Sequence, residues 1–290
     1  MRPLLLAAFA ASAACTPSFE GPEIVRDLRV LAVQAEPPEA TIDLSTGKAA
    51  PVQVRVLAVD PAPREAMTAS GSLCFPTDSR RCDEVQNVSI GAAQMVADEG
   101  PSWTLQVPPA IIQAAVQEDD LKGFGGVRVQ LSVNVADGDP HGPVFADKVL
   151  LFSPPGGSVN HNPSIASLEL TNDGAPAGTV LGGGRPSLPV GVPIGILPHL
   201  AEGEGGAETY TTTDLQGNAV TLTESPRYSF FALAGADLDT AIADEPLPGT
   251  RPPKGLVRLT PLQAGPGTFW IVVRDGRGGI GWLAVDYQAN

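Results

Sequence analysis

Four glycines near the C-terminus have the spacing of a nucleotide-binding turn. The segment GRGGIG, residues 276–281, satisfies the pattern G-x-G-x-x-G. Such a turn must follow a strand and open a helix, whose N-terminus receives the pyrophosphate. A strand-like run precedes it, but only WLAVDYQAN follows, which is too short for a helix and a second strand. The glycines therefore predict a tight hairpin turn with positive φ angles and no nucleotide site.

Three histidines are the candidate catalytic bases. Nucleophilic catalysis needs a base beside a nucleophile, and the base is usually histidine. His141 lies in a predicted turn, His161 in a predicted linker and His199 at a strand end. None of them stands in a recognisable motif, and the sequence contains no G-x-S-x-G. We expect loop or surface histidines and no enzyme.

Two aspartate pairs have the residue types of a glycosidase or of a calcium site. Asp137 lies two residues before Asp139, and Asp237 two residues before Asp239. Paired carboxylates hydrolyse glycosidic bonds, and loop oxygens bind Ca²⁺. Both pairs lie in turn-rich segments, where acidic residues have local roles, and neither has the spacing of an EF-hand. The four aspartates are weak calcium candidates; no metal site or cofactor is expected.

Tryptophans bear on the alternative of glycan binding. Trp103, Trp270 and Trp282 are expected to lie in cores, whereas a sugar platform would expose two or more aromatic rings. Alternation from Phe269 places Trp270 on the opposite strand face. One face of this strand could therefore carry an exposed ring, which keeps a carbohydrate- or peptidoglycan-binding module as the alternative.

Two of the three cysteines lie close together, at Cys74 and Cys82. A disulfide between them would close the nine-residue loop CFPTDSRRC, with an entropic stabilisation of ~2.6 kcal/mol. A zinc site needs four ligands, and no histidine is near. We expect a disulfide, with a reduced pair as the alternative.

The N-terminus has the features of an export signal. Arg2 precedes an apolar run from Leu4 to Ala14, about half the length of a membrane-spanning helix. The segment SAAC resembles the end of a bacterial lipoprotein signal, which implies that residues 1–14 are removed and Cys15 is lipidated. The other interpretation is an ordinary signal peptide cleaved near Ala14, with Cys15 as a free thiol. Residues 15–26 read as a tether.

Localisation and membrane partner follow from the same resemblance. Thr16 stands where an Asp often marks inner-membrane retention in Gram-negative lipoproteins, so the resemblance implies the outer membrane. The lipid would then be the membrane attachment, with the protein facing the periplasm or the cell surface. The net charge of -14 disfavours nucleic acid, because an acidic surface repels phosphate.

The composition and strand patterns predict an all-β protein. The 290 residues include 32 Gly and 29 Pro, which indicates many turns. Residues 127–135, VRVQLSVNV, alternate strictly between apolar and polar, and residues 109–121 predict the one short helix. The Pro- and Gly-rich segment 153–163 reads as a linker between two units, 27–152 and 164–290. Both units are expected to be antiparallel β-sandwiches.

Two resemblances complete this interpretation. GTFWIVVRDGRGGIGWLAV resembles the last two strands of PKD and related immunoglobulin-like modules, and YSF at 228–230 stands where those modules carry Tyr-x-Trp. The layout, from DLRVLAVQAEPPEA to VVRDGRGGIGW, resembles uncharacterised envelope lipoproteins of myxobacteria and similar bacteria. Together they imply two consecutive immunoglobulin-like (PKD-like) sandwiches with a structural, adhesive or protein-binding role, and a protein or glycan partner in the envelope.

Overall fold

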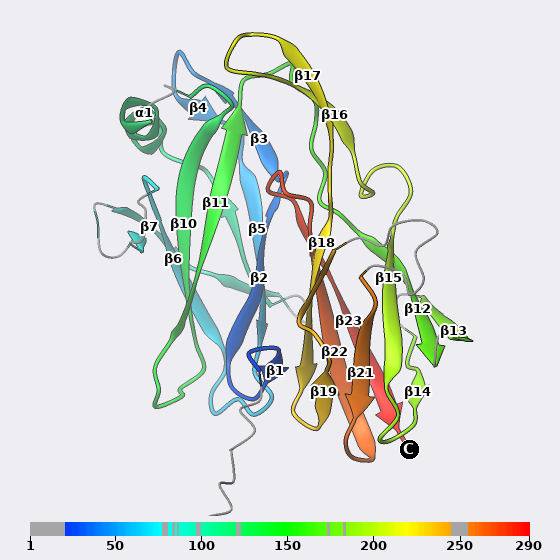
Figure 1. Cartoon of the computed structure of the whole chain (residues 1–290). Coiled ribbons are helices and arrows are strands. Elements are labelled where there is room, and N and C mark those ends of the chain that lie inside the picture. The colour runs from blue at the N-terminus through cyan, green and yellow to red at the C-terminus, as the bar shows by residue number, and fades with distance from the viewer. Residues whose placement is uncertain are drawn as a thin grey trace, which may run out of the picture.

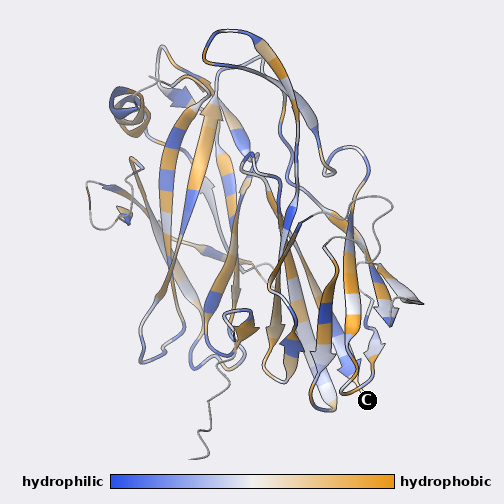
Figure 2. Ribbon diagram, viewed as in Figure 1, coloured by the Kyte–Doolittle hydropathy of each residue, from blue (hydrophilic) through white to orange (hydrophobic). Residues whose placement is uncertain are grey.

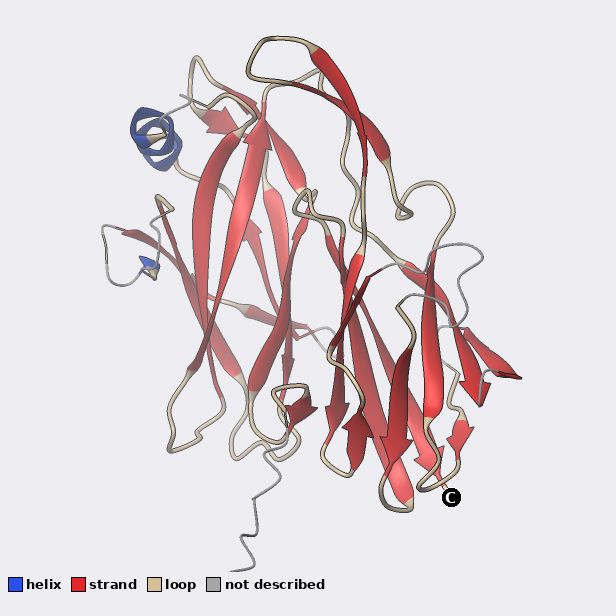
Figure 3. Ribbon diagram, viewed as in Figure 1, coloured by secondary structure: helices blue, strands red, loops and turns tan. Residues whose placement is uncertain are grey.

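The chain folds into two β-sandwiches that lie side by side (Figures 1 and 3). The computed structural model describes residues 21–76, 81–82, 85, 87–96, 100–119, 123–172, 175–181, 184–244 and 255–290. Nearly all of its regular structure is strand, with one helix in the first unit, so the predicted all-β class is confirmed. In this part of the chain no helix is long and apolar enough to span a bilayer.

The first sandwich consists of two sheets around one apolar core. The larger sheet runs β4 (Lys48–Ala49), β3 (Glu39–Asp43), β11 (Val144–Ser153), β10 (Val127–Ala136), β6 (Thr68–Cys74) and β7 (Asn87–Ala92). The smaller runs β2 (Arg29–Glu36), β5 (Val52–Val59), β9 (Gly100–Leu105) and β8 (Gln94–Val96). Their facing side chains form one continuous buried cluster that includes Trp103.

Strand β10 confirms the alternation read from the sequence. Its apolar residues from Val127 to Val135 are all buried in the core. The opposite face is partly covered as well, because Gln130 and Ser132 are 7% and 6% exposed. The Ser132 hydroxyl accepts the backbone N–H of Cys82 at 3.0 Å, so the disulfide-linked segment covers part of the polar face of β10.

The predicted helix is α1 (Pro109–Glu118), which follows Pro108 and ends before Asp119. Proline suits a first helical turn because its missing N–H would have no partner there. Ile112 and Ala115 are buried against the first core. The predicted end at residue 121 lies outside the described residues.

The second sandwich has two sheets and a separate hairpin. One sheet runs β1 (Ile24–Val25), β18 (Arg227–Leu233), β22 (Gly265–Arg274), β23 (Ile280–Ala289) and β14 (Ser187–Leu188), with β20 (Ile242–Asp244) beside β18. The other runs β13 (Ala175–Leu181), β12 (Ile165–Asn172), β15 (Ile194–Leu200), β21 (Val257–Pro261) and β19 (Ala236–Leu238). The hairpin is β16 (Thr209–Thr213) and β17 (Ala219–Thr223).

The end of the predicted tether is a strand of the second sandwich. Ile24 and Val25 pair in parallel with Ala232 and Leu233 of β18. The boundary at residue 26 therefore needs correction, because Ile24 and Val25 are buried at 3% and 0% exposure. Removing two large apolar residues from water favours docking them over leaving them in a solvated tether.

The two sandwiches share an apolar interface in addition to the linker. Val25, Leu31, Ala32, Trp270 and Val272 form a third buried cluster, with Trp282 packed against it. It joins the outer faces of β2, β22 and β23, which lie next to each other in Figures 1 and 2. The strand face that carries Trp270 is thus covered by the first sandwich, and the ring is only 7% exposed.

Candidate functional site

The glycine-rich segment is the tight turn between β22 and β23. The Asp275 carboxylate accepts the backbone N–H groups of Arg277, Gly278 and Gly279 at 2.7, 3.0 and 2.9 Å. Gly276 and Gly278 have φ angles of 89° and 114°, which residues with a Cβ rarely adopt. The predicted hairpin is confirmed: a strand follows the glycines, in place of the helix that a nucleotide site needs.

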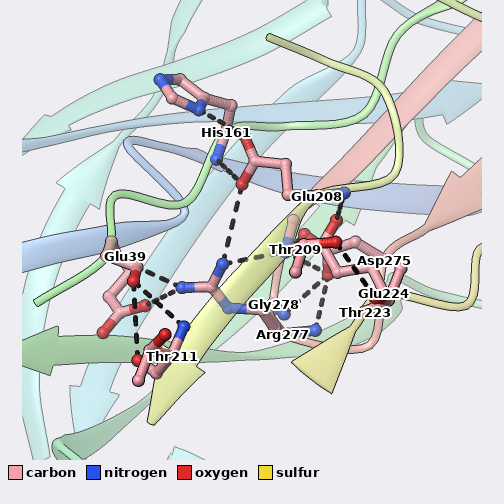
Figure 4. Close-up of polar contacts among 12 residues, drawn as sticks. Glu39, His161, Glu208, Thr209, Thr211, Thr223, Glu224, Asp275, Arg277 and Gly278 are labelled. Carbon is pink, nitrogen blue, oxygen red and sulfur yellow. Dashed lines mark hydrogen bonds and ion pairs between the residues drawn. The ribbon is translucent and has the colours of Figure 1, made fainter. Parts of the chain in front are cut away.

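This turn directs Arg277 into the boundary between the sandwiches (Figure 4). The guanidinium pairs with Glu39 of β3 at 3.2 Å, Glu224 at 3.4 Å and Glu208 at 3.6 Å. It also lies over the ring of Tyr210, 4.0 Å from the centroid. The Arg277 side chain is only 11% exposed, so these contacts are poorly screened by solvent.

Two further titratable side chains lie close to Arg277. His161 of the linker lies 2.5 Å from Glu208, and the buried Lys148 ammonium donates to the carbonyl of Gly278. Burial lowers the pKa of Lys148 to about 8, against the attraction of Asp275. Burial also raises the pKa of Glu224, and Arg277 offsets this only in part.

We call this set of residues the Arg277 junction; it consists of Glu39, Lys148, His161, Glu208, Glu224 and Arg277.

The predicted linker is held by the same junction. Its Ser158 carbonyl accepts from Arg277, and its Asn162 side-chain oxygen accepts the backbone N–H of Ile280 at 2.9 Å. The Asn162 amide donates to the carbonyl of Ala35 at 2.7 Å, so one side chain joins both sandwiches. These contacts fix the orientation of the two units.

A groove lies beside the junction. Its volume is about 660 Å³, and Arg277 is one of the residues that line it. One wall belongs to the first sandwich and the other to β16. We call it the distal groove, with the wall residues Phe124, Arg128, Val149, Leu151, Tyr210, Thr211, Thr212 and Thr213. Phe124 and Val149 are 41% and 47% exposed.

The distal groove lies at the end of the molecule opposite β1. Strand β11 ends at the groove with Leu151 and Ser153, and Figure 1 shows its arrow directed toward the end with α1 and the β16–β17 hairpin. Strand β1 lies at the other end in the same view. Strand β1 and the distal groove therefore lie at opposite ends of the long axis of the protein.

The predicted disulfide is present. Cys74 and Cys82 are bonded, with a Cα–Cα distance of 5.2 Å, and both are 0% exposed. Cys15, the predicted lipidation site, lies outside the described residues.

The calcium candidates have local partners. Burial, together with the neighbouring Asp137 side chain, raises the pKa of Asp60. The Asp60 side chain in turn lowers the pKa of Asp137. Asp139 accepts the backbone N–H of His141 at 2.7 Å.

The second pair is also engaged locally. Asp239 accepts the backbone N–H of Arg258 at 2.8 Å and pairs with its guanidinium, while Asp237 lies on the exposed side of β19. Within the described ranges, no group of three or more His, Cys, Asp or Glu side chains is arranged to hold a metal ion.

The histidines and tryptophans are dispersed. His199 pairs with Glu169 at 3.4 Å and His141 lies in the exposed β10–β11 turn, so neither is near His161 at the junction. Trp103 is buried in the first core. The guanidinium carbon of Arg55 lies over the Trp282 ring, 5.6 Å from the ring centroid. These residues do not form a site together.

The Arg277 junction was not predicted from the sequence. In the sequence Arg277 belongs only to a glycine-rich pattern, because its carboxylate partners lie at the distant positions 39, 208 and 224. The one local signal is an arginine inside a tight D-G-x-G-G turn, which points a long cation away from its own sheet.

Comparisons with known proteins find only distant structural similarity. No protein-family model matches the sequence, and a comparison with curated proteins finds no match. A red sea bream transglutaminase is 12% identical with a TM-score of 0.27; the match covers 92% of this chain and 32% of that one, so the chain spans about a third of it.

Two bacterial structures are similar at the same level. A bacterial ice-binding adhesin structure is 9% identical with a TM-score of 0.26, over 92% of this chain and 100% of the other. Fibronectin(III)-like modules of Clostridium thermocellum CbhA are 9% identical with a TM-score of 0.22, over 89% and 94%. Scores this low carry no argument about function.

Proposed function

We propose that this chain is a lipid-anchored cell-envelope protein with a structural, adhesive or protein-binding role. In this proposal Cys15 carries the lipid and holds the chain at the outer membrane, and the distal groove receives a protein partner from the envelope. The proposal assigns no catalysis to the chain.

The observation that carries the proposal is the position of the groove relative to β1. Ile24 docks beside β18 at one end of the molecule, and the distal groove lies at the other (Figure 1). A lipid attached nine residues before Ile24 would therefore leave the groove directed away from the membrane. The Arg277 junction would hold that groove rigidly, because its two walls belong to the two sandwiches.

The chemistry of the groove favours a protein segment. Val149, Leu151 and Phe124 offer apolar contact, Arg128 offers a cation, and the threonines of β16 offer hydroxyl groups. Mixed apolar and polar linings of this kind are typical of protein-binding surfaces.

The glycan alternative has weaker support. Trp270 is covered by the first sandwich, and Trp282 packs beside it under Arg55. In the groove, the face of the Tyr210 ring is occupied by Arg277. A sugar platform needs an aromatic face that is open, so we favour a protein partner.

Metabolic labelling with a fatty-acid analogue tests the anchor. The wild type is expected to be labelled and to sediment with membranes, and Cys15→Ala is expected to lose both properties. Equal labelling of the two proteins would refute the lipid anchor.

Photo-crosslinking in the envelope tests the groove. A photoreactive residue at Val149 is expected to give a discrete adduct, and one at His141, at the opposite end, is the control. The purified partner should then bind the wild type and His141→Asp alike, and bind Val149→Asp at least tenfold more weakly. Adducts with peptidoglycan alone, or equal binding by all three proteins, would overturn the protein-binding role.

A further inference from the structure

The β16–β17 hairpin has one covered edge and one open edge. Ser158 of the linker covers β16, since its hydroxyl accepts the N–H of Thr211 at 3.3 Å and donates to the Thr211 carbonyl at 3.5 Å. Strand β17 pairs only with β16 among the described strands. Its five residues are AVTLT, and four of them are exposed.

The ladder shows which backbone groups of β17 point outward. At one end of the β16–β17 ladder the Glu224 N–H donates to the Glu208 carbonyl, and at the other end the Asp214 N–H donates to the Asn218 carbonyl, both at 2.9 Å. Hydrogen-bonded pairs in an antiparallel ladder recur at every second residue. The N–H and C=O groups of Ala219, Thr221 and Thr223 therefore face away from β16.

This edge lacks the features that usually prevent strands from pairing. Proteins protect edges by short length, charge, proline, bulges or a covering segment. In the part of the chain that the structure describes, every other edge strand has one of these. Strands β1, β4, β8, β14, β19 and β20 have two or three residues, β7 and β13 face a register shift, and β2 carries Arg29 and Glu36.

We propose that β17 pairs antiparallel with β17 of a second copy of this chain, about a two-fold axis at Thr221. In this register Thr221 lies opposite its own counterpart, and Ala219 lies opposite Thr223 of the other copy. All three are outward-facing positions, so each exchanges both backbone hydrogen bonds with its partner residue. The two hairpins become one four-stranded sheet.

The side chains fit the same register. Val220 lies opposite Leu222 of the other copy in a non-hydrogen-bonded pair, where Cβ atoms are about 5 Å apart. Leu222 is 42% exposed in the single chain, and this contact covers it. None of the five residues of β17 is charged, although the chain has a net charge of -14.

The acidic residues next to the seam are engaged within their own chain: Glu224, which follows β17, is buried and pairs with Arg277 at 3.4 Å. Asp214 accepts the N–H groups of Gln216 and Asn218 at 2.9 and 2.8 Å. A second copy is favoured over a foreign strand because the apolar pair and the hydrogen-bonding groups match under one two-fold axis.

The pairing is expected to be weak in solution. Five residues from each copy bury less than the ~1,200 Å² of a standard stable interface. The dimer should therefore form reversibly as protein concentration rises. It does not depend on lipidation or on a partner in the distal groove.

Sedimentation over a concentration series tests the proposal with a matched pair of variants. Thr221→Lys places like charges opposite each other across the axis and is expected to weaken dimerisation at least tenfold. Thr179→Lys makes the same change at an exposed position of β13, another edge strand, and should leave the dimer unchanged. Amide exchange should slow at Ala219, Thr221 and Thr223 as the dimer forms.

Three outcomes would overturn the proposal. A wild type that stays monomeric at all concentrations would exclude self-pairing, including the case where a foreign strand protects β17 in the envelope. A dimer equally strong in Thr221→Lys would place the contact elsewhere. Equal weakening by both lysine variants would indicate general charge repulsion. Melting temperatures verify that both variants fold.

Discussion

Arg277 and Glu39 form an ion pair at 3.2 Å that joins the two sandwiches, although the two residues are 238 positions apart in the sequence. Glu39 belongs to β3 of the first unit and Arg277 to the last turn of the second. Both side chains are at most 18% exposed. The orientation of the units therefore depends on a charge pair shielded from solvent.

Replacing Arg277 by Met should destabilise the protein strongly. Glu39, Glu208 and Glu224 would lose their shared cation in a site with little solvent, a change that typically costs about 3–5 kcal/mol. Urea unfolding measures the loss. Arg258→Met is the control, because its pair with Asp239 is exposed and should contribute less than about 1 kcal/mol. Equal losses in the two variants would contradict the role of the junction.

Trp270→Ala should uncouple the two sandwiches. Trp270 is buried in the interface cluster, outside both sandwich cores, so its loss weakens the contact between units by about 3–5 kcal/mol. Calorimetry is expected to show two unfolding transitions where the wild type shows one. Leu262→Ala, at a position 58% exposed, should leave the single transition intact. A single transition in Trp270→Ala would argue against coupling through this cluster.

Replacing both cysteines of the disulfide by serine should lower stability by ~2.6 kcal/mol, because the closed loop has nine residues. Denaturant unfolding of the wild type with and without reductant provides a second measurement. Reductant should have no effect on the double variant. An unchanged wild type in reductant would show that the loop is held by other contacts.

Lys148 should make stability depend on pH in the alkaline range. Its pKa is lowered to about 8 in the folded state, from 10.5. Between these values the unfolded chain holds more protons at this residue, so the free energy of unfolding rises with pH. Relative to Lys148→Met, the wild type should gain up to about 3 kcal/mol between pH 8 and 10.5. Urea unfolding at several pH values measures this difference.

Lys48→Met is the matched control for that series, since Lys48 is an exposed lysine on β4. It shows what the loss of a solvent-accessible lysine does over the same pH range. A difference between wild type and Lys148→Met that stays constant with pH would contradict the lowered pKa.

Features set by short stretches of sequence were predictable. The alternation of 127–135 defined a strand, Pro108 and Pro109 defined the start of α1, and the glycines after Asp275 defined a turn. The spacing of Cys74 and Cys82 likewise predicted the disulfide. Each of these depends on neighbours within about ten residues, which a sequence displays directly.

Features set by distant contacts were not predictable. The pairing of Ile24 with Ala232 and the partners of Arg277 depend on how two complete sandwiches meet. One signal of the interface was present in the sequence. Residues 269–273, FWIVV, form an unbroken apolar run, which is typical of a strand covered on both faces. Alternation alone could not say what covers the second face.

The pairing of β1 has a mechanical consequence. A pull on residue 21 reaches both sandwiches within a few residues. The carbonyls of Glu23 and Val25 accept the N–H groups of Ala232 and Ala234 at 3.0 and 3.3 Å, and the chain runs on from β1 into β2. Parallel pairing places those bonds in shear. A load applied at residue 21 is thus divided between the two sandwiches and does not detach the strands of the first sandwich one after another.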